Sequence, residues 1–256
     1  MAVDEAILET TGQNDTLPTL RLYAWEPACL SLGYAQPISD VDIPRLQARG
    51  WDMVRRPTGG RAVLHIDELT YSVIAPLNDP RVSGALLESY HRLANAIVEA
   101  LRLLALPVEI QEQAAIHSAQ NTNPVCFEVP STYEITVNGK KLVGSAQARR
   151  KDGVLQHGSL PLSGDLTRIL QVLVYPNEPA RTGAAKQLLA RATTVETALG
   201  RIVKWEEAAQ AFSTAFQSVF DLDLQPSDLT PREKIRAEDL ATIKYSHPEW
   251  TQKQSD

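Results

Sequence analysis

A pair of adjacent glycines separates two short runs of strand-forming residues, and no other feature constrains the fold of this chain as strongly. The two runs, residues 52–54 and 62–64, have apolar members that suit short buried strands. Because two positions lack a Cβ atom, the connection at residues 57–60 can turn tightly and let a ligand approach its backbone. The alternative is an ordinary hairpin turn, with Arg55 and Arg56 on a solvated strand edge.

A second pattern lies further along the chain, where alternating runs at residues 133–137 and 140–147 flank Asn138-Gly139. Asn-Gly between alternating apolar residues is the strongest short-range signal for a β-hairpin. Cys126 stands ahead of this hairpin, and Lys141 lies on its return strand. A cysteine is a good nucleophile only as a thiolate, which a nearby positive charge stabilises. The pattern therefore makes Cys126 and Lys141 candidates for nucleophilic catalysis.

Two neighbouring lysines compete for that role. Successive side chains of a strand point to opposite faces, so Lys141 shares a face with Val143 and Ser145, and Lys140 faces the other way. This alternation favours Lys141. The alternative for Cys126 is an inert, half-buried thiol. The other cysteine, Cys29, lies in an apolar strand and is expected to be a small buried hydrophobe.

The glycine loop, the hairpin and a third run at residues 155–160 resemble, in order and spacing, the lipoate ligase, biotin ligase and octanoyltransferase superfamily. The resemblance extends from about Asp4 to residues 247–250 and covers nearly the whole chain. Within the superfamily, the chain is most similar to the cysteine-dependent octanoyltransferases of the LipM type. In that type a cysteine ahead of the hairpin works with a lysine on the return strand, and Cys126 and Lys141 occupy those positions.

The resemblance implies a two-step acyl transfer. Cys126 would take an octanoyl group from octanoyl-acyl carrier protein as a thioester, and a lysine of a lipoyl-domain protein would then receive it as an amide. The implied acceptors are proteins such as the glycine cleavage H protein and the E2 subunit of 2-oxoacid dehydrogenases. No cofactor is expected, because a thioester is already activated, and ATP with magnesium would be needed only by a ligase. Lys141 would activate the thiol and shuttle protons.

The acyl-binding site is expected around the same motifs. Small side chains in the glycine loop and on the return strand would leave a slot for an unbranched acyl chain, polar ones would order its mouth, and two histidines would shape the site. The candidates are Arg56, Thr58, Gly59, Gly60, Arg61, His65, Gly144, Ser145, Ala146, Gln147, His157 and Gly158.

The predicted fold is α+β, with a mixed, largely antiparallel sheet flanked by helices, because strands and helices do not alternate regularly. We expect a single catalytic domain over residues 1–256, which includes the helices after about residue 192, and no separate accessory domain. The predicted helices lie near residues 2–11, 43–49 and 83–105, the predicted meander strands near 132–137, 140–148 and 153–160, and a long loop at 111–125.

Two further patterns concern the helices. The apolar face of the helix at 83–105 is predicted to be buried core, and it consists of Leu86, Tyr90, Leu93, Ile97, Leu101 and Leu104. Capping boxes at the starts of two later helices are predicted at Thr193 with Glu196, and at Thr230 with Glu233. Ala208, Phe212 and Phe216 are expected to form the buried stripe of the helix between them.

Composition narrows the function classes. A formal charge of −6 without a long basic stripe argues against nucleic-acid binding. No apolar run approaches the roughly 20 residues that cross a bilayer, and the start lacks a basic signal-like region, so a cytoplasmic location without membrane contact is expected. Two cysteines and scattered histidines give no metal-site spacing. Arg149-Arg150-Lys151 is either a solvated hairpin tip or a local positive patch for acidic protein partners.

Three other functions remain open from the sequence. An ATP-dependent lipoate-protein ligase would use the same loop and Lys141 to hold an adenylate. Such ligases usually carry a third glycine where this chain has Arg61, which favours the transferase. A non-catalytic module that binds acyl groups and lipoyl domains is disfavoured because Cys126 and Lys141 are both present. A biotin ligase is the weakest alternative, because no DNA-binding or small C-terminal barrel region is apparent.

Overall fold

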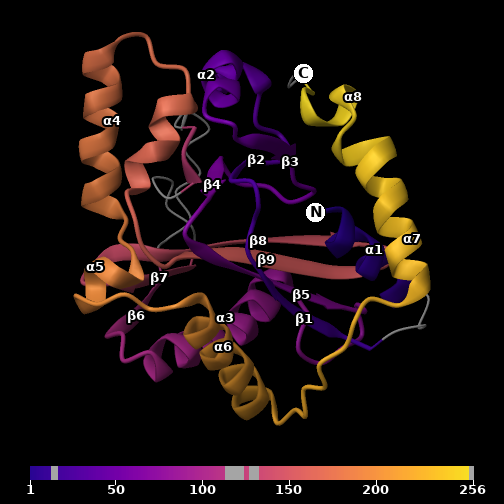
Figure 1. Ribbon diagram of the computed structural model, residues 1–256. Coiled ribbons are helices and arrows are strands. Elements are labelled where there is room, and N and C mark those ends of the chain that lie inside the picture. The colour runs from indigo at the N-terminus through magenta and orange to yellow at the C-terminus, as the bar shows by residue number, and fades with distance from the viewer. Residues whose placement is uncertain (13–16, 113–123, 127–132, 254–256) are drawn as a thin grey trace.

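The computed structural model describes residues 1–12, 17–112, 124–126 and 133–253 (Figure 1). Two sheets form its centre. The larger has six antiparallel strands in the order β1-β5-β9-β8-β7-β6, and the smaller has three in the order β3-β2-β4. The strands are β1 (Thr19–Tyr23), β2 (Cys29–Leu32), β3 (Asp52–Arg55), β4 (Val63–His65), β5 (Glu68–Ala75), β6 (Val108–Glu112), β7 (Tyr133–Val137), β8 (Lys140–Arg150) and β9 (Gly153–Pro161). The predicted α+β class with a largely antiparallel sheet is confirmed.

Helices cover both faces of the larger sheet. Figure 1 shows α3 and α6 beneath it, and the smaller sheet with α2 and α4 above it. The lower layer is the main apolar core, where the Tyr71 ring of β5 lies 5.8 Å from that of Phe212 on α6. The helices are α1 (Ala2–Thr11), α2 (Ile43–Ala48), α3 (Leu86–Leu103), α4 (Glu178–Arg191), α5 (Val195–Leu199), α6 (Trp205–Phe220), α7 (Pro231–Leu240) and α8 (Pro248–Thr251), with short helical turns η1 (Ile38–Asp40), η3 (Leu166–Val172) and η4 (Ala241–Tyr245).

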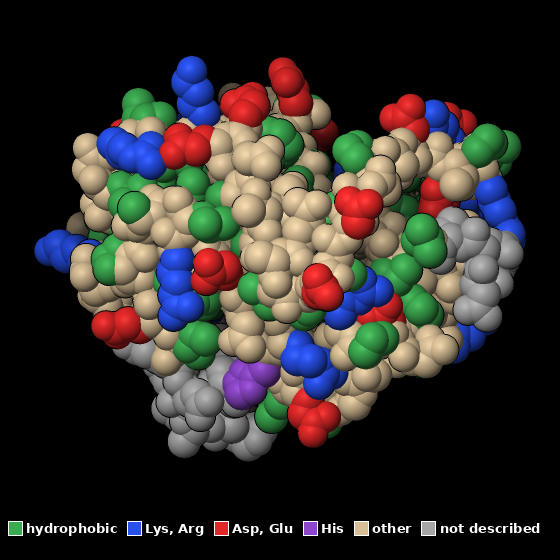
Figure 2. Space-filling model, turned by 90° about the horizontal axis from the view of Figure 1, so that it is seen from below, with side chains coloured by type: hydrophobic (Ala, Val, Ile, Leu, Met, Phe, Trp, Pro, Cys, Tyr) green, Lys and Arg blue, Asp and Glu red, His purple; other side chains and the backbone are tan. Residues whose placement is uncertain are grey.

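The lower face of the molecule is shown in Figure 2. Acidic and basic side chains are interspersed on it, with apolar groups scattered between them. Such a mixed surface produces no extended field of one sign. In the described part of the chain, no helix is both long enough and apolar enough to cross a membrane.

The glycine loop is not a hairpin turn, and that alternative is wrong. Strand β2 lies between β3 and β4, pairing parallel with β3 and antiparallel with β4. The loop therefore has to pass over the end of β2 instead of joining two neighbours. It packs closely there: a Cβ atom built on Gly33, just after β2, would lie 1.9 Å from the carbonyl oxygen of Gly60. A glycine at position 33 is what allows this crossing.

The meander β7-β8-β9 has the predicted order. Asn138 and Gly139 form its first turn, both with positive φ, as an Asn-Gly hairpin requires. A bulge between Ile135 and Thr136 shifts the register, so that Thr136 faces Lys141 and Ile135 faces Val143. The extra residue changes which side chains of β7 lie near the return strand.

Several local predictions need correction. Leu86 is 47% exposed, because α3 begins there and its first turn projects beyond the sheet, whereas Leu93, Ile97 and Leu101 are buried as predicted. The segment expected to be a loop from residue 111 begins with β6, which continues to Glu112, and residues 113–123 lie outside the described part of the chain.

The helix starts give a mixed result. The cap of α5 is Thr194, whose side chain accepts a hydrogen bond from the Thr197 amide, so the box predicted at Thr193 is one residue too early. The capping box of Thr230 and Glu233 at α7 is confirmed. The buried stripe of α6, formed by Ala208, Phe212 and Phe216, is confirmed as well.

Candidate functional site

Cys126 lies at the end of the glycine loop. Its amide donates to the carbonyl of Ala62 at 3.0 Å, and the Ala62 amide donates to the Pro124 carbonyl at 3.0 Å. Val125 and Ala62 thereby form a short parallel bridge, which fixes the backbone of the half-buried cysteine against the start of β4. Main-chain hydrogen bonds thus hold the end of the glycine loop and Cys126 together, although they are far apart in the sequence.

Lys141 is buried and paired. Its Nζ donates to Oε1 of Glu134 at 3.1 Å, and both side chains are at least four-fifths buried. Lys140 extends to the other side, where its Nζ donates to the Leu189 carbonyl. The alternation argument therefore selected the buried lysine. Sequence reasoning missed Glu134, although an acidic residue on the inward side of a predicted strand is a recognisable signal for a buried pair.

Tyr90 on α3 connects these two groups electrostatically. Burial raises the pKa of its hydroxyl, and the negative charges available at Cys126 and Glu134 raise this pKa further. Tyr90 was predicted only as a core residue of the helix, and the helical periodicity of α3 carried no signal of an electrostatic link to Cys126.

The two arginines before the glycine loop have different roles. The side chain of Arg55 is fully buried and donates to six main-chain carbonyls of the described chain, among them those of Gly33, Gln36 and Trp250. The indole of Trp250 donates in return to the Arg55 carbonyl at 2.8 Å. This pair ties α8 and the end of the described chain to the glycine loop, and the solvated-edge alternative is wrong for Arg55.

Arg56 shapes the loop from inside. Its guanidinium is 4% exposed and donates to the carbonyls of Gly59 and Arg61 and to both oxygens of Ser31. Gly60 adopts φ +93°, and a Cβ atom there would lie 3.0 Å from the same guanidinium. No described atom lies within 4 Å of the position a Cβ would take on Gly59, so the loop is open at that residue.

The loop is also joined to the larger sheet through a hydroxyl–imidazole contact, and a second such contact lies within the smaller sheet. Thr58 Oγ1 lies 2.6 Å from Nε2 of His157 on β9. Burial lowers the pKa of His157 to about 3, so this imidazole is neutral near neutral pH. His65 on β4 lies 2.7 Å from Ser31 Oγ and 2.6 Å from Glu68 Oε1, and its ring stacks on Trp25.

The predicted acyl-binding residues of the return strand lie along the β8–β9 ladder. Gly144, Ser145, Ala146 and Gln147 pair in turn with Ser159, Gly158, His157 and Gln156. The space beside Gly158 is filled, because a Cβ there would lie 2.5 Å from the Tyr71 ring. Tyr71 also contacts Ser145 Oγ at 2.7 Å and accepts from Gln156, and its pKa is raised to about 12 by burial.

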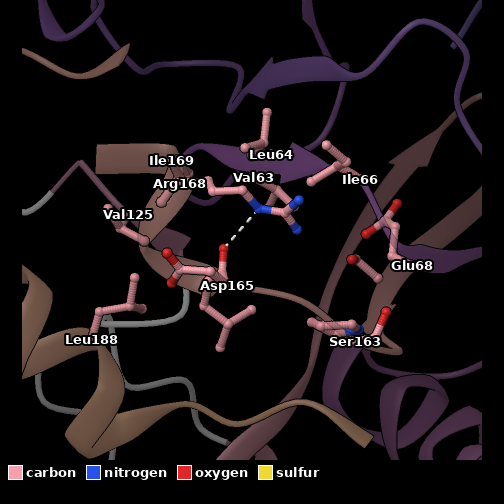
Figure 3. Close-up of a pocket in the computed structure, with 13 residues that line it drawn as sticks. Val63, Leu64, Ile66, Glu68, Val125, Ser163, Asp165, Arg168, Ile169 and Leu188 are labelled. Atoms are coloured by element: carbon pink, nitrogen blue, oxygen red, sulfur yellow. Dashed lines mark hydrogen bonds between the residues drawn. The ribbon is translucent and has the colours of Figure 1, made fainter. Parts of the chain in front are cut away.

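A pocket opens next to the Cys126 segment (Figure 3). It contains about 470 Å³ of empty space, part of it open to solvent. Figure 3 shows the apolar side chains of Val125 and Leu188 on one side and Glu68 and Ser163 on the other, with Arg168 held between by Asp165. The lining residues are Val63, Leu64, Ile66, Glu68, Val125, Ser159, Pro161, Ser163, Asp165, Leu166, Arg168, Ile169 and Leu188. None of the predicted site residues lines this pocket, although Leu64, Ile66, Val125 and Ser159 are sequence neighbours of predicted ones.

The remaining candidates lie apart from this site. Cys29 is 4% exposed, and burial raises its pKa to about 12, so it is the inert thiol that the sequence predicted. In the basic run, Arg149 is half-buried and donates to the Val82 carbonyl and Ser89 Oγ. Only Arg150 and Lys151 remain exposed there, so a positive patch at this hairpin end is smaller than the sequence predicted.

Comparisons with known proteins agree with this architecture. Residues 1–217 match the family described as lipoyl protein ligase A/B catalytic domain. The chain is 42% identical over 251 residues to "Octanoyltransferase LipM" of Moorella thermoacetica and 38% identical over 255 residues to that of Brevibacillus brevis. Each alignment covers 98% of this chain and 92% of the relative.

A solved structure described as lipoate-protein ligase A bound with ATP is similar as well. It superposes with a TM-score of 0.78 and 27% identity, and the match covers 98% of this chain and 92% of that one.

Proposed function

Because the chain belongs to the lipoyl protein ligase A/B catalytic domain family, we propose that it is an octanoyltransferase that moves an octanoyl group from acyl carrier protein to a lysine of a lipoyl-domain protein. The observation that carries this proposal is a half-buried thiol, Cys126, that main-chain hydrogen bonds hold at the end of the glycine loop. A ligase that works through an adenylate needs no such thiol.

In the first step, the Cys126 thiolate attacks the carbonyl carbon of the carrier-bound thioester. A new carbon–sulfur bond forms to Cys126, and the carrier thiol leaves with the electron pair of the old bond. Its departure is easier if a proton is supplied, and Lys141 is the proposed donor. The products are an octanoyl-enzyme thioester and the free carrier thiol, so one thioester replaces another and no ATP is consumed.

In the second step, the neutral amine of the acceptor lysine attacks the octanoyl thioester. An amide forms, Cys126 leaves as a thiolate, and the proton lost by the amine passes to Lys141. Glu134 holds the lysine in place for both transfers, because it accepts the hydrogen bond of Nζ at 3.1 Å. The amide is more stable than the thioester, which drives the reaction forward.

We propose that the acyl chain extends from Cys126 along the apolar side of the pocket in Figure 3. Val125 directly precedes Cys126, and Val63 and Leu188 continue the apolar surface from it. The carbonyl end would lie at the open part of the glycine loop near Gly59, with Arg56, Thr58 and His157 holding that loop. The remaining acyl-binding candidates, Gly60, Arg61, His65, Gly144, Ser145, Ala146, Gln147 and Gly158, are proposed to support the walls of this region.

The test is a transfer assay with purified octanoyl-acyl carrier protein and a lipoyl domain, without ATP. Mass spectrometry of the acceptor should detect octanoylation by the wild type and none by Cys126→Ala. Leu188→Trp, which fills the pocket, should slow octanoyl transfer more than butyryl transfer. A parallel reaction with free lipoate, ATP and magnesium identifies the alternative: modification there that survives Cys126→Ala would assign the chain to the ligases.

A further inference from the structure

A chain of hydrogen bonds runs through the buried interior behind the glycine loop. It begins at the carboxylate of Glu68, passes through the His65 imidazole and the Ser31 hydroxyl, and ends at the Arg56 guanidinium. The successive distances are 2.6, 2.7 and 3.1 Å, and all four side chains are more than nine-tenths buried. Neither the glycine loop nor the hairpin motif indicates such a chain.

The two charged ends of this chain fix the direction of the bonds that they make. A guanidinium can only donate, so Ser31 Oγ accepts from Arg56. The Ser31 hydroxyl still has its own hydrogen and a second lone pair for the contact with His65 Nε2. At the other end a carboxylate oxygen can only accept, so His65 Nδ1 donates to Glu68 Oε1. Thr70 donates to the same oxygen, and Trp25 both donates to Thr70 and stacks on His65.

The anchored guanidinium has no carboxylate partner of its own in the described part of the chain. Its other hydrogen bonds go to the carbonyls of Ser31, Gly59 and Arg61, none of which carries a formal charge. Burial lowers the pKa of Arg56 from its ordinary value, and Cys126 acts on it in the opposite direction. An arginine remains charged under these conditions, so a permanent cation lies within electrostatic reach of Cys126.

The backbone connects the same two residues. Arg56 holds the Arg61 carbonyl at 2.6 Å, and the next residue, Ala62, exchanges two main-chain hydrogen bonds with the segment that carries Cys126. The position of the guanidinium and the position of the thiol are therefore coupled by only a few covalent and hydrogen bonds. Lys141, the other cation of the site, has its charge balanced by Glu134.

We propose that Arg56, fixed by the chain from Glu68 through His65 and Ser31, is a positioning residue that supplies the permanent positive charge favouring the thiolate of Cys126. Its value for acyl transfer rests on the function proposed above, whereas its effect on the thiol does not require an acyl donor. Among the described residues, the electrostatics here also involve Arg55, which acts on Arg56, and Tyr90 on α3, whose raised pKa reflects burial and the charges of Cys126 and Glu134. Tyr90 stays protonated because its pKa is raised, and Lys141 is balanced by Glu134, so the cation on the loop has a distinct role.

The experiment measures the rate at which iodoacetamide alkylates Cys126 between pH 5 and pH 10, read by peptide mass so that Cys29 is scored separately. In Arg56→Met the midpoint of the pH profile should rise by about one pH unit, which lowers the rate at pH 7 about tenfold because only the thiolate reacts. Arg56→Lys keeps the charge but lacks the planar guanidinium with its several donors, so its midpoint should lie between that of Arg56→Met and that of the wild type. Ser31→Ala, which removes one link of the chain, should give a smaller loss, about twofold to threefold.

Arg201→Met is the matched control, because it removes the charge of an exposed arginine paired with Glu207. Its profile should equal that of the wild type. The proposal is overturned if folded Arg56→Met has the midpoint of the wild type. If the methionine variant does not fold, the proposal is overturned when Arg56→Lys and Ser31→Ala both have the midpoint of the wild type. Failure of octanoyl transfer with a shifted alkylation profile would instead overturn the function proposed above and leave this inference standing.

Discussion

Two buried cations of the site, Arg56 and Lys141, have opposite surroundings. In the glycine-loop region, residues 55–65, Arg56 is surrounded by carbonyl and hydroxyl oxygens and is separated from the nearest acid of its chain, Glu68, by Ser31 and His65. In the β7–β8 hairpin, Lys141 contacts the carboxylate of Glu134 directly. A directly paired cation is largely neutralised, whereas a carbonyl-bound one keeps its field.

This difference suggests a division of labour. An arginine keeps its proton at any pH the fold tolerates, so Arg56 can act only through charge and position. A lysine ammonium can give up and regain a proton, and a carboxylate partner keeps it oriented while it does so. The glycine-loop region would therefore set up the nucleophile, and the hairpin would handle the protons of each acyl transfer.

The largest expected effect comes from removing the proton carrier. Lys141→Met should reduce octanoyl transfer about 10²- to 10⁴-fold, the usual contribution of a general acid–base group. Lys141→Arg should not restore transfer, because guanidinium does not release a proton near neutral pH. Single-turnover rates with octanoyl-acyl carrier protein measure both. If Lys141→Arg transfers as fast as the wild type, the two cations are interchangeable and the comparison fails.

The direct pairing in the hairpin also predicts a stability effect. Lys141→Met leaves the buried Glu134 carboxylate without its cation, which should lower the free energy of unfolding by about 3 kcal/mol. In the double variant Lys141→Met with Glu134→Gln, no unpaired charge remains, so most of that stability should return while transfer stays lost. Urea unfolding of the two variants separates the structural role of the pair from its chemical role. Equal stabilities would show that the pair is not coupled.

His157, which joins the glycine-loop region to the larger sheet, should make stability depend on pH. Its pKa is about 3 in the folded chain against an ordinary value of 6.5, so the unfolded chain binds the proton first as pH falls. The contribution of the neutral His157 to the free energy of unfolding is therefore complete above about pH 6.5. It is lost as the pH falls toward 3, with a slope of up to about 1.4 kcal/mol per pH unit. His157→Gln should flatten the profile of thermal unfolding between these limits. A parallel profile would contradict the buried, neutral imidazole.

The smallest effect is expected at Tyr71, behind the β8–β9 ladder. Tyr71→Phe keeps the ring against Phe212 but removes the hydroxyl that Ser145 and Gln156 contact. A loss of about 1 kcal/mol in unfolding free energy is expected, with transfer nearly unchanged, because hydrogen bonds of this kind contribute about that much. A loss of transfer comparable to that of Lys141→Met would mean that this hydroxyl belongs to the acyl site.

The sequence predicted the features that depend on neighbouring residues, and it missed the pairing of distant strands. The hairpin at Asn138-Gly139 was predictable because turn chemistry acts over a few residues, and the same is true of the cap at Thr230. The insertion of β2 between β3 and β4 was not, because strand pairing between distant segments leaves no local signal. Ser31 was missed for the same reason, because its partner His65 is 34 positions away. Glu134 and Glu68 lie only seven and three positions from Lys141 and His65, and they were missed because the sequence alone does not show that these pairs are buried.

The most direct test of the account is the intact mass of the enzyme after incubation with octanoyl-acyl carrier protein, without ATP and without an acceptor. The account predicts that one octanoyl group is added, that hydroxylamine removes it as it removes a thioester, and that peptide mapping finds it on Cys126. Cys126→Ala should gain no mass, and Cys29 should remain unmodified. An octanoyl group on Cys29, label retained by Cys126→Ala, or addition that requires ATP would contradict the central claim.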